Sequence, residues 1–272
     1  MRRPRGKTLE TDTEPVAQSR PAAGVALLTL SLPEMRNAMT AEMTVAWDHA
    51  VADVMADGDV RAVVVTGAGS AFCSGADLSW LDQGRAHENT PDQLRSKLLP
   101  FYRSWLSARD IAVPVIAAVN GPAVGAGLAL ALACDVRYAA PTATFSAPFS
   151  QIGTHAGLGA TWLLREAIGM SRAREMLYTG RTVGAYEAVN WGLASAVADD
   201  VVPFAVSMAE KIARAAPIAV RLTKSTLAQV EQGLEASLQA EALAQAVTLA
   251  SEDIHEGIDA IRSHRAPDFR GR

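Results

Sequence analysis

Two glycine- and alanine-rich segments have the residue types and spacing that could do chemistry. Each follows an aliphatic run and precedes a predicted helix: residues 67–77 (GAGSAFCSGAD) and residues 120–127 (NGPAVGAG). Backbone N–H groups at the start of a helix have no partner within it, and the helix dipole helps them bind negative charge. Two such donors aimed at one carbonyl oxygen would form an oxyanion hole, which stabilises an enolate or a tetrahedral anion. Either segment alone is explained equally well as a tight turn.

Other glycine-rich sites and metal sites are disfavoured because residues they need are missing. Each segment contains a GxG, but Phe72 and Leu130 occupy the third glycine position of a dinucleotide fingerprint. The sequence has no GxxxxGK[ST] phosphate loop, no GxSxG nucleophile turn and no HExxH zinc motif. Two cysteines, Cys73 and Cys134, are too few for a disulfide framework or a cysteine-based zinc site. An enzyme with this sequence would rely heavily on backbone amides.

The composition predicts a globular protein with a sizeable core. The 272 residues are 49% hydrophobic and 20% charged, with a net charge of −4, which excludes general disorder and disfavours nucleic acid as a partner. No apolar run of membrane-spanning length lacks polar breaks, and the basic N-terminus has no apolar segment behind it. We therefore expect no membrane partner and no signal peptide. Residues 1–21 are predicted to be a disordered extension, and the two cysteines suit a reducing cytoplasm.

The elements that must position the two segments form an alternating pattern. Aliphatic runs at residues 25–30, 61–66 and 114–119 predict buried strands, and helices are predicted between them. From Pro203 onward only helical periodicity remains. This order predicts an α/β core over residues 22–202 followed by a helical C-terminal region over residues 203–272.

Together, in this order and spacing, the two segments resemble the crotonase (enoyl-CoA hydratase/isomerase) superfamily, in particular its actinobacterial-type members. Further matches are residues 32–39 (LPEMRNAM), 134–137 (CDVR), 216–224 (APIAVRLTK) and 264–272 (HRAPDFRGR). The resemblance extends over about residues 22–272. It implies a spiral of ββα units and a helical C-terminal region that builds homotrimers, or hexamers as dimers of trimers.

The resemblance also implies a cytoplasmic enzyme of fatty acyl-CoA metabolism, a lyase or isomerase, that binds an acyl-CoA thioester and needs no metal or separate cofactor. The amides of Ala76 and Ala126 would form the oxyanion hole. Phe269 would reach the CoA site of a neighbouring subunit. Arg36 could equally be a solvated charge, and Asp77 a helix cap. The residues implied to line the CoA and acyl path are Arg36, Asn37, Ala38, Gly75, Ala76, Asp77, Leu78, Gly125, Ala126 and Phe149.

The sequence departs from the family pattern at the proton carriers. Ala129 and Phe149 stand where family hydratases carry two glutamates, and neither side chain can move a proton. His155 is the first substitute, since an imidazole serves as acid or base near neutral pH. Asp82 and His87 are further candidates. The reaction is therefore open between hydration, isomerisation, thioester hydrolysis and decarboxylation, and a non-catalytic acyl-CoA-binding protein remains an alternative.

Overall fold

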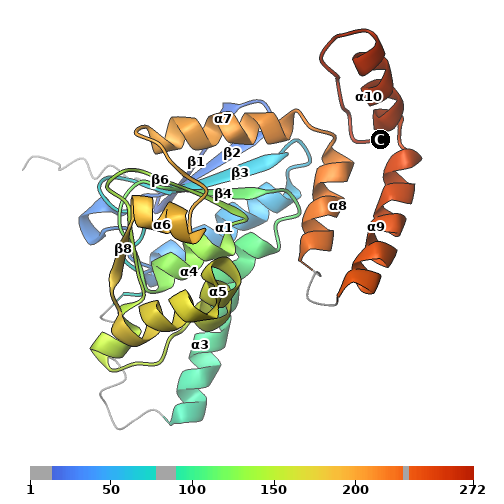
Figure 1. Ribbon diagram of the computed structural model, residues 1–272. Coiled ribbons are helices and arrows are strands. Elements are labelled where there is room, and N and C mark those ends of the chain that lie inside the picture. Colours follow the sequence, from blue (N-terminus) through green and yellow to red (C-terminus); the bar gives the residue numbers. More distant parts are fainter. Residues whose placement is uncertain (1–13, 78–89, 229–232) are drawn as a thin grey trace, which may run out of the picture.

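The computed structural model describes residues 14–77, 90–228 and 233–272 (Figure 1). Its main sheet has six strands in the order β1-β2-β3-β4-β6-β9; β1 runs antiparallel to β2, and the other neighbours are parallel. A second sheet has the order β5-β7-β8. The strands are β1 Val16–Ala22, β2 Val25–Leu30, β3 Ala62–Gly67, β4 Val115–Val119, β5 Ala123–Val124, β6 Val136–Ala139, β7 Thr144–Ser146, β8 Thr182–Gly184 and β9 Ala196–Val197.

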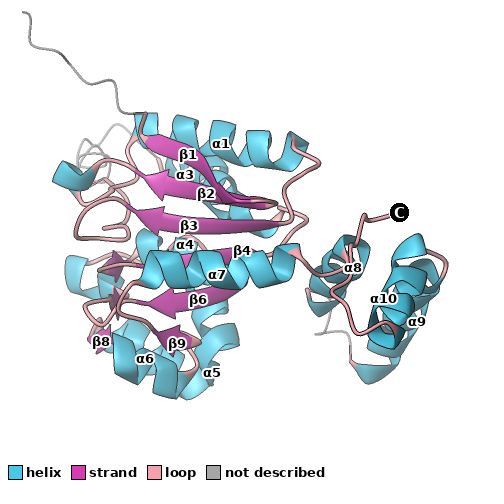
Figure 2. Ribbon diagram, turned by 90° about the horizontal axis from the view of Figure 1, so that it is seen from above, coloured by secondary structure: helices cyan, strands magenta, loops and turns pink. Residues whose placement is uncertain are grey.

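Helices cover both faces of the main sheet, as its apolar central strands require. Every residue of β3 and β4 is buried, which is typical of parallel strands packed on both sides. Helix α7 packs on β2, β3 and β4 from one face, and α1 contacts β1 and β2 from the other (Figures 1 and 2). The helices of this part are α1 Ala41–Ala56, α3 Pro91–Leu106, α4 Ala126–Ala133, α5 Ala160–Thr179, α6 Ala185–Trp191 and α7 Val201–Ala213, with short 3-10 turns at Pro33–Met35, Ser107–Arg109 and Pro148–Ile152.

A stacked pair of tryptophans joins α1 to α3. The rings of Trp47 and Trp105 lie 5.2 Å apart at an angle of 13°, and both side chains are fully buried. The indole N–H of Trp47 donates to the Ser104 carbonyl oxygen at 3.1 Å, and that of Trp105 donates to the Thr44 hydroxyl at 3.0 Å. Large aromatic surfaces with satisfied polar edges make strong packing anchors. The pair therefore fixes the C-terminal end of α3, whose preceding turns line the candidate site.

Three C-terminal helices stand apart from the sheet: α8 Pro217–Leu227, α9 Leu234–Leu249 and α10 Glu252–Arg262 (Figures 1 and 2). The Lys224 ammonium ties α8 to the main body through the Val113 carbonyl oxygen at 3.0 Å and the Asp135 carboxylate at 2.8 Å. The Arg61 guanidinium donates to the Phe269 carbonyl oxygen at 2.9 Å and holds the end of the chain. None of the described residues of α8 or α9 is buried, so these helices offer a large outer surface.

The predicted mixed α/β fold with a helical C-terminal region is confirmed. The predicted disordered extension over residues 1–21 is too long, because Val16–Ala22 form the edge strand β1, paired with β2. Its mostly exposed, polar sequence contains Pro21 and lacks the aliphatic signal of a buried strand. Within the helical region predicted from residue 203, α7 packs on the sheet, and the helices that stand apart begin with α8.

Candidate active site

The first glycine-rich segment follows β3 and is held by two asparagine side chains. The Asn37 amide nitrogen lies 3.0 Å from the Ala68 carbonyl oxygen and 2.8 Å from that of Ala71. Asn120 supports the same loop, since its side-chain oxygen accepts from the Gly67 amide at 3.1 Å and its nitrogen donates to the Gly69 carbonyl at 3.0 Å. The two asparagines therefore hold the loop backbone from two sides, and the Ser74 hydroxyl adds a hydrogen bond to the Met35 carbonyl oxygen at 3.2 Å.

The second segment runs beside the first through β5 and then begins α4. The Val124 amide donates to the Cys73 carbonyl oxygen at 3.0 Å, so the two loops pair backbone to backbone. A Cβ on Gly127 would lie only 2.2 Å from the Cys73 carbonyl oxygen, and one on Gly121 would lie 2.1 Å from that of Ser70. Only glycine allows this approach.

The amides predicted to bind an anion lie where the loops meet. Ala126 is the first residue of α4, so its N–H has no carbonyl four residues earlier within the helix. Its N-cap, Gly125, has φ +55° and no side chain to cap the helix. A Cβ on Gly75 would lie 3.3 Å from the Ala126 nitrogen, which places the residue before Ala76 directly against this helix start. The two alanine amides thus belong to adjacent backbone segments.

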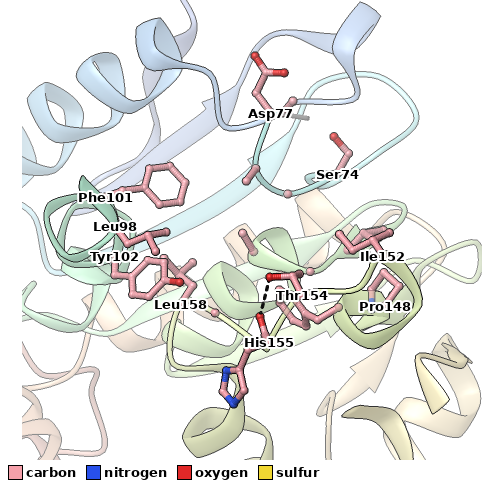
Figure 3. Close-up of a pocket in the computed structure, with 18 of the residues that line it drawn as sticks. Ser74, Asp77, Leu98, Phe101, Tyr102, Pro148, Ile152, Thr154, His155 and Leu158 are labelled. Atoms are coloured by element: carbon pink, nitrogen blue, oxygen red, sulfur yellow. Dashed lines mark hydrogen bonds between the residues drawn. The ribbon is translucent and has the colours of Figure 1, made fainter. Parts of the chain in front are cut away.

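Both alanines line a cavity of about 650 Å³ between the loops, α3 and the turn before α5 (Figure 3). Six other residues predicted for the site also line it: Ala38, Gly75, Asp77, Gly125, Phe149 and His155. The remaining lining residues come largely from α3 and from residues 148–158, and they include Met35, Ser74, Leu94, Lys97, Leu98, Phe101, Tyr102, Val124, Pro148, Ile152, Thr154, Gly157 and Leu158. The cavity therefore has a mainly apolar lining with a few polar groups, as small-molecule sites have.

Three predicted site residues lie outside the lining of this cavity. Arg36 is exposed at the end of the first 3-10 turn, and its carbonyl oxygen accepts from the Ser74 amide at 3.0 Å. The Asn37 side chain is fully buried and committed to the loop it supports. The Phe269 ring packs beside Gly257 of α10, and its carbonyl oxygen accepts from the Arg61 guanidinium. Leu78, Asp82 and His87 fall outside the described residues.

The positions expected to carry protons contain no carboxylate. Ala129 is fully buried, one helical turn after Ala126. The Phe149 ring lies against the second loop, 3.8 Å from where a Cβ on Gly125 would stand. Among the described residues that line the cavity, Asp77 alone carries a carboxylate, and Figure 3 shows it pointing away from Tyr102.

His155 lies at the rim of the cavity, and its side chain is exposed. Its Nδ1 lies 2.7 Å from the Ala156 carbonyl oxygen, a contact in which Nδ1 is the donor. The Thr154 hydroxyl donates to the His155 carbonyl oxygen at 3.5 Å (Figure 3). In that view the imidazole points away from Ser74 and Asp77. A proton carried by this ring would reach the cavity interior through a ring rotation or a water molecule.

The cavity wall formed by α3, including Tyr102, was not predicted from the sequence. Leu94, Leu98 and Tyr102 are spaced four residues apart and share a helix face, a pattern that predicts a helix face but not the cavity it borders. Burial raises the pKa of the Tyr102 hydroxyl, while a hydrogen bond from the Leu158 amide lowers it in part. The phenol is therefore protonated at neutral pH.

The part of the chain that the structure describes has neither a cluster of metal ligands nor a membrane-spanning helix. No group of three or more histidine, cysteine or acidic side chains is placed to hold a metal ion in the described ranges. Every helix of those ranges is too short or too polar to cross a bilayer.

Comparison with known proteins agrees with this geometry. The family profile described as enoyl-CoA hydratase/isomerase matches residues 20–272. A Mycobacterium tuberculosis H37Rv protein named probable enoyl-CoA hydratase EchA14 is 42% identical over 248 residues, covering 91% of this chain and 92% of that protein. The 2,3-dehydroadipyl-CoA hydratase of Escherichia coli K12 is 35% identical over 254 residues, covering 91% of this chain and 96% of that protein. A crystal structure of enoyl-CoA hydratase from Bacillus anthracis has a TM-score of 0.88 at 32% identity, covering 95% of this chain and 100% of that chain. The chain belongs to the enoyl-CoA hydratase/isomerase family and has the crotonase fold.

Proposed function

We propose that the chain is an enzyme of fatty acyl-CoA metabolism that binds an acyl-CoA thioester and stabilises its enolate in a backbone oxyanion hole. The observation that supports this proposal is that Ala76 and Ala126, from two separate loops, line one cavity beside the start of α4. In this proposal the thioester carbonyl oxygen accepts hydrogen bonds from both amides. Each donor of this kind stabilises a transition-state anion by about 3–4 kcal/mol.

In the same proposal the CoA moiety follows the first loop, and the acyl chain enters the cavity. Arg36 to Ala38 and Gly75 to Leu78 would line the CoA path, with Asn37 acting through the loop that it supports. Gly125 and Phe149 would contact the acyl group near the carbonyl. The support for this arrangement is that Ala38, Asp77 and Phe149 border the same cavity.

The reaction is proposed to differ from two-carboxylate hydration. That mechanism needs an acid and a base beside the substrate, and Ala129 and Phe149 offer neither. We propose another reaction whose anion an oxyanion hole stabilises, with His155 or a bound water moving the proton. The anion would be an enolate in isomerisation or decarboxylation, and a tetrahedral anion in thioester hydrolysis, where water adds to the carbonyl carbon and the CoA thiolate leaves. Among the described residues that line the cavity, Asp77 alone carries a carboxylate. This observation also favours a second candidate function, a non-catalytic acyl-CoA-binding protein.

We further propose that the protein works in the cytoplasm as a homotrimer, or as a hexamer of two trimers. Support comes from the apolar surface of α9 and α10, where Leu234 is 75% exposed, Leu243 is 73% exposed and Ile261 is 77% exposed. Covering such a surface with a second copy would remove apolar area from water. In the assembly Phe269 would reach the CoA site of a neighbouring subunit. Sedimentation of the purified protein tests this proposal, and a monomer at micromolar concentration would refute it.

Calorimetric titration with acyl-CoA thioesters of several chain lengths tests the binding proposal. Saturable heat is expected for at least one length, with less affinity for free CoA, which lacks the thioester oxygen. If no chain length gives heat, the thioester site is refuted. Turnover assays on the thioesters that bind then separate the enzyme from the non-catalytic binder.

A further inference from the structure

The hydroxyl of Tyr102 is a hydrogen-bond donor in an otherwise apolar part of the cavity. Tyr102 lies on α3 beside Leu98 and Phe101, and Leu158 faces it from the turn before α5 (Figure 3). The Leu158 amide donates a hydrogen bond to the phenol oxygen. A hydroxyl that accepts from an amide keeps its own proton for donation. Within the described ranges, no protein acceptor takes that proton.

Gly157 makes room for this hydroxyl. A Cβ on Gly157 would lie 2.6 Å from the Tyr102 hydroxyl oxygen and 3.2 Å from the ring carbon that carries it. Gly157 is not among the glycines with positive φ, so its backbone conformation does not itself require glycine. The phenol occupies the space that any side chain at position 157 would need. The glycine and the tyrosine therefore act as a pair that presents one hydroxyl to the cavity.

A donor that no described residue accepts from, in such surroundings, favours a ligand that can accept from it. A site built to hydrogen-bond a substrate group rejects analogues that lack the group, because its own polar atom is then left unsatisfied. We propose that the Tyr102 hydroxyl selects acyl groups that carry a hydrogen-bond-accepting oxygen along the chain, in preference to plain alkyl chains. This inference rests on the proposed function, since it assigns the acyl chain to this cavity.

The test is a binding series of equal chain length. Hexanoyl-CoA is compared with hexanoyl-CoA thioesters that carry one hydroxyl at carbon 3, 4, 5 or 6, and each Kd is measured by titration calorimetry. We expect the protein to bind at least one hydroxylated member about fivefold more tightly than hexanoyl-CoA, as one added hydrogen bond predicts. Tyr102→Phe should remove this preference, so that hexanoyl-CoA and its hydroxylated derivatives bind with the same Kd.

A second variant displaces the Tyr102 hydroxyl without removing it. Gly157→Ala should push the phenol aside, because the contact is with the far end of a side chain, and should also remove the preference. Combined with Tyr102→Phe, Gly157→Ala should have no further effect on the preference, since the displaced hydroxyl is already gone. Tyr178→Phe is the matched control, because Tyr178 is 73% exposed and does not line the cavity.

The outcomes separate this inference from the proposal beneath it. If the protein binds none of the five thioesters, the proposed acyl-CoA function fails. If it binds all five equally, or if the preference survives Tyr102→Phe, acyl-CoA binding stands and the role of Tyr102 is refuted.

Discussion

Gly75 and Ala126 face each other where the two loops meet. A Cβ on Gly75 would lie 3.3 Å from the Ala126 nitrogen and 2.7 Å from the Val124 carbonyl oxygen. Gly75 also has φ +96°, a conformation that L side chains rarely adopt. The loops thus meet at a separation that only a hydrogen atom on the Gly75 Cα permits, and the amides beside this contact border the cavity.

Gly75→Ala should therefore damage the site. The strained conformation alone costs about 1–3 kcal/mol, and relieving the contact with Val124 must move the backbone that carries the Ala126 amide. We expect lower stability in urea unfolding and about a tenfold loss of acyl-CoA affinity, the equivalent of about one hydrogen bond. Gly58→Ala is the control, because nothing lies within 4 Å of its Cβ position. Undiminished affinity in Gly75→Ala would contradict the shared oxyanion site.

Hydration of crotonyl-CoA should be very slow and should improve when a carboxylate is supplied. Phe149 lines the cavity, so Phe149→Glu places a carboxyl group there, and with Ala129→Glu it restores the family pattern. A positioned acid or base contributes about 10²–10⁴ in rate, so a large part of that factor should appear in the double variant. The loss of enoyl absorbance measures the reaction. The matched control is Phe149→Gln with Ala129→Gln, which adds polarity without a proton carrier. If the unmodified protein hydrates crotonyl-CoA rapidly, the assignment of positions 129 and 149 to the two glutamates of the family is overturned.

His155→Ala should separate proton transfer from binding. If the imidazole moves the proton, kcat on the active thioester should fall by about 10²-fold or more. The Kd should hardly change, because the ring lies at the rim and, among the described residues, its hydrogen-bond partner is the Ala156 carbonyl. Steady-state kinetics and calorimetry on the same preparation give both numbers. His49→Ala serves as a control on an exposed histidine of α1. Unchanged kcat would assign His155 to loop structure.

Asn37 should be needed for stability. Its side chain is fully buried, its oxygen accepts from the Leu32 amide at 3.0 Å, and its nitrogen donates to loop carbonyls. Asn37→Asp keeps the shape but removes the donors, which leaves buried carbonyls unpaired beside a negative charge. The expected loss is about 2–4 kcal/mol in urea unfolding. Asn190→Asp on the exposed end of α6 should change stability little. Equal effects of the two substitutions would refute the supporting role of Asn37.

The two thiols should make the protein less stable at alkaline pH. Burial raises the pKa of Cys73 and Cys134 to about 12, against 9.0 for an unperturbed thiol. Between these values the unfolded chain has lost the protons that the folded chain keeps. The free energy of unfolding therefore falls as pH rises above about 9, by about 1.4 kcal/mol per pH unit for each thiol. Urea unfolding at pH 8, 9 and 10 should show a shallower fall in the Cys73→Ala/Cys134→Ala protein. Parallel pH profiles for the two proteins would contradict this.

The elements that the sequence predicts well are those whose burial dictates their composition. β2 and β4 are aliphatic because helices cover both faces of the sheet, and Thr40 caps α1 by accepting from the Met43 amide. Strand β1 was missed because an edge strand owes its place to pairing with β2 and buries little of its own sequence. The two-residue strand β5 was missed because it is defined by its pairing with β7 and by a bridge to Cys73, and two residues carry no strand pattern of their own.

The candidate site likewise has parts that the sequence predicts and parts that it does not. The paired loops were predictable because glycines and alanines must stand where backbones touch. The α3 wall was not predicted, since no local pattern says which face of an amphipathic helix borders a cavity rather than the core. The relation between Gly157 and Tyr102 joins residues 55 positions apart in the chain, and it is visible only in three dimensions.

The stacked Trp47–Trp105 pair gives the protein an optical signal of its own. Two indoles at 5.2 Å couple their electronic transitions, and the near-ultraviolet circular dichroism depends on how they are oriented. One ring sits on α1 and the other on the last turn of α3. A ligand that shifts α3 as it fills the cavity would thus change the spectrum without any added label.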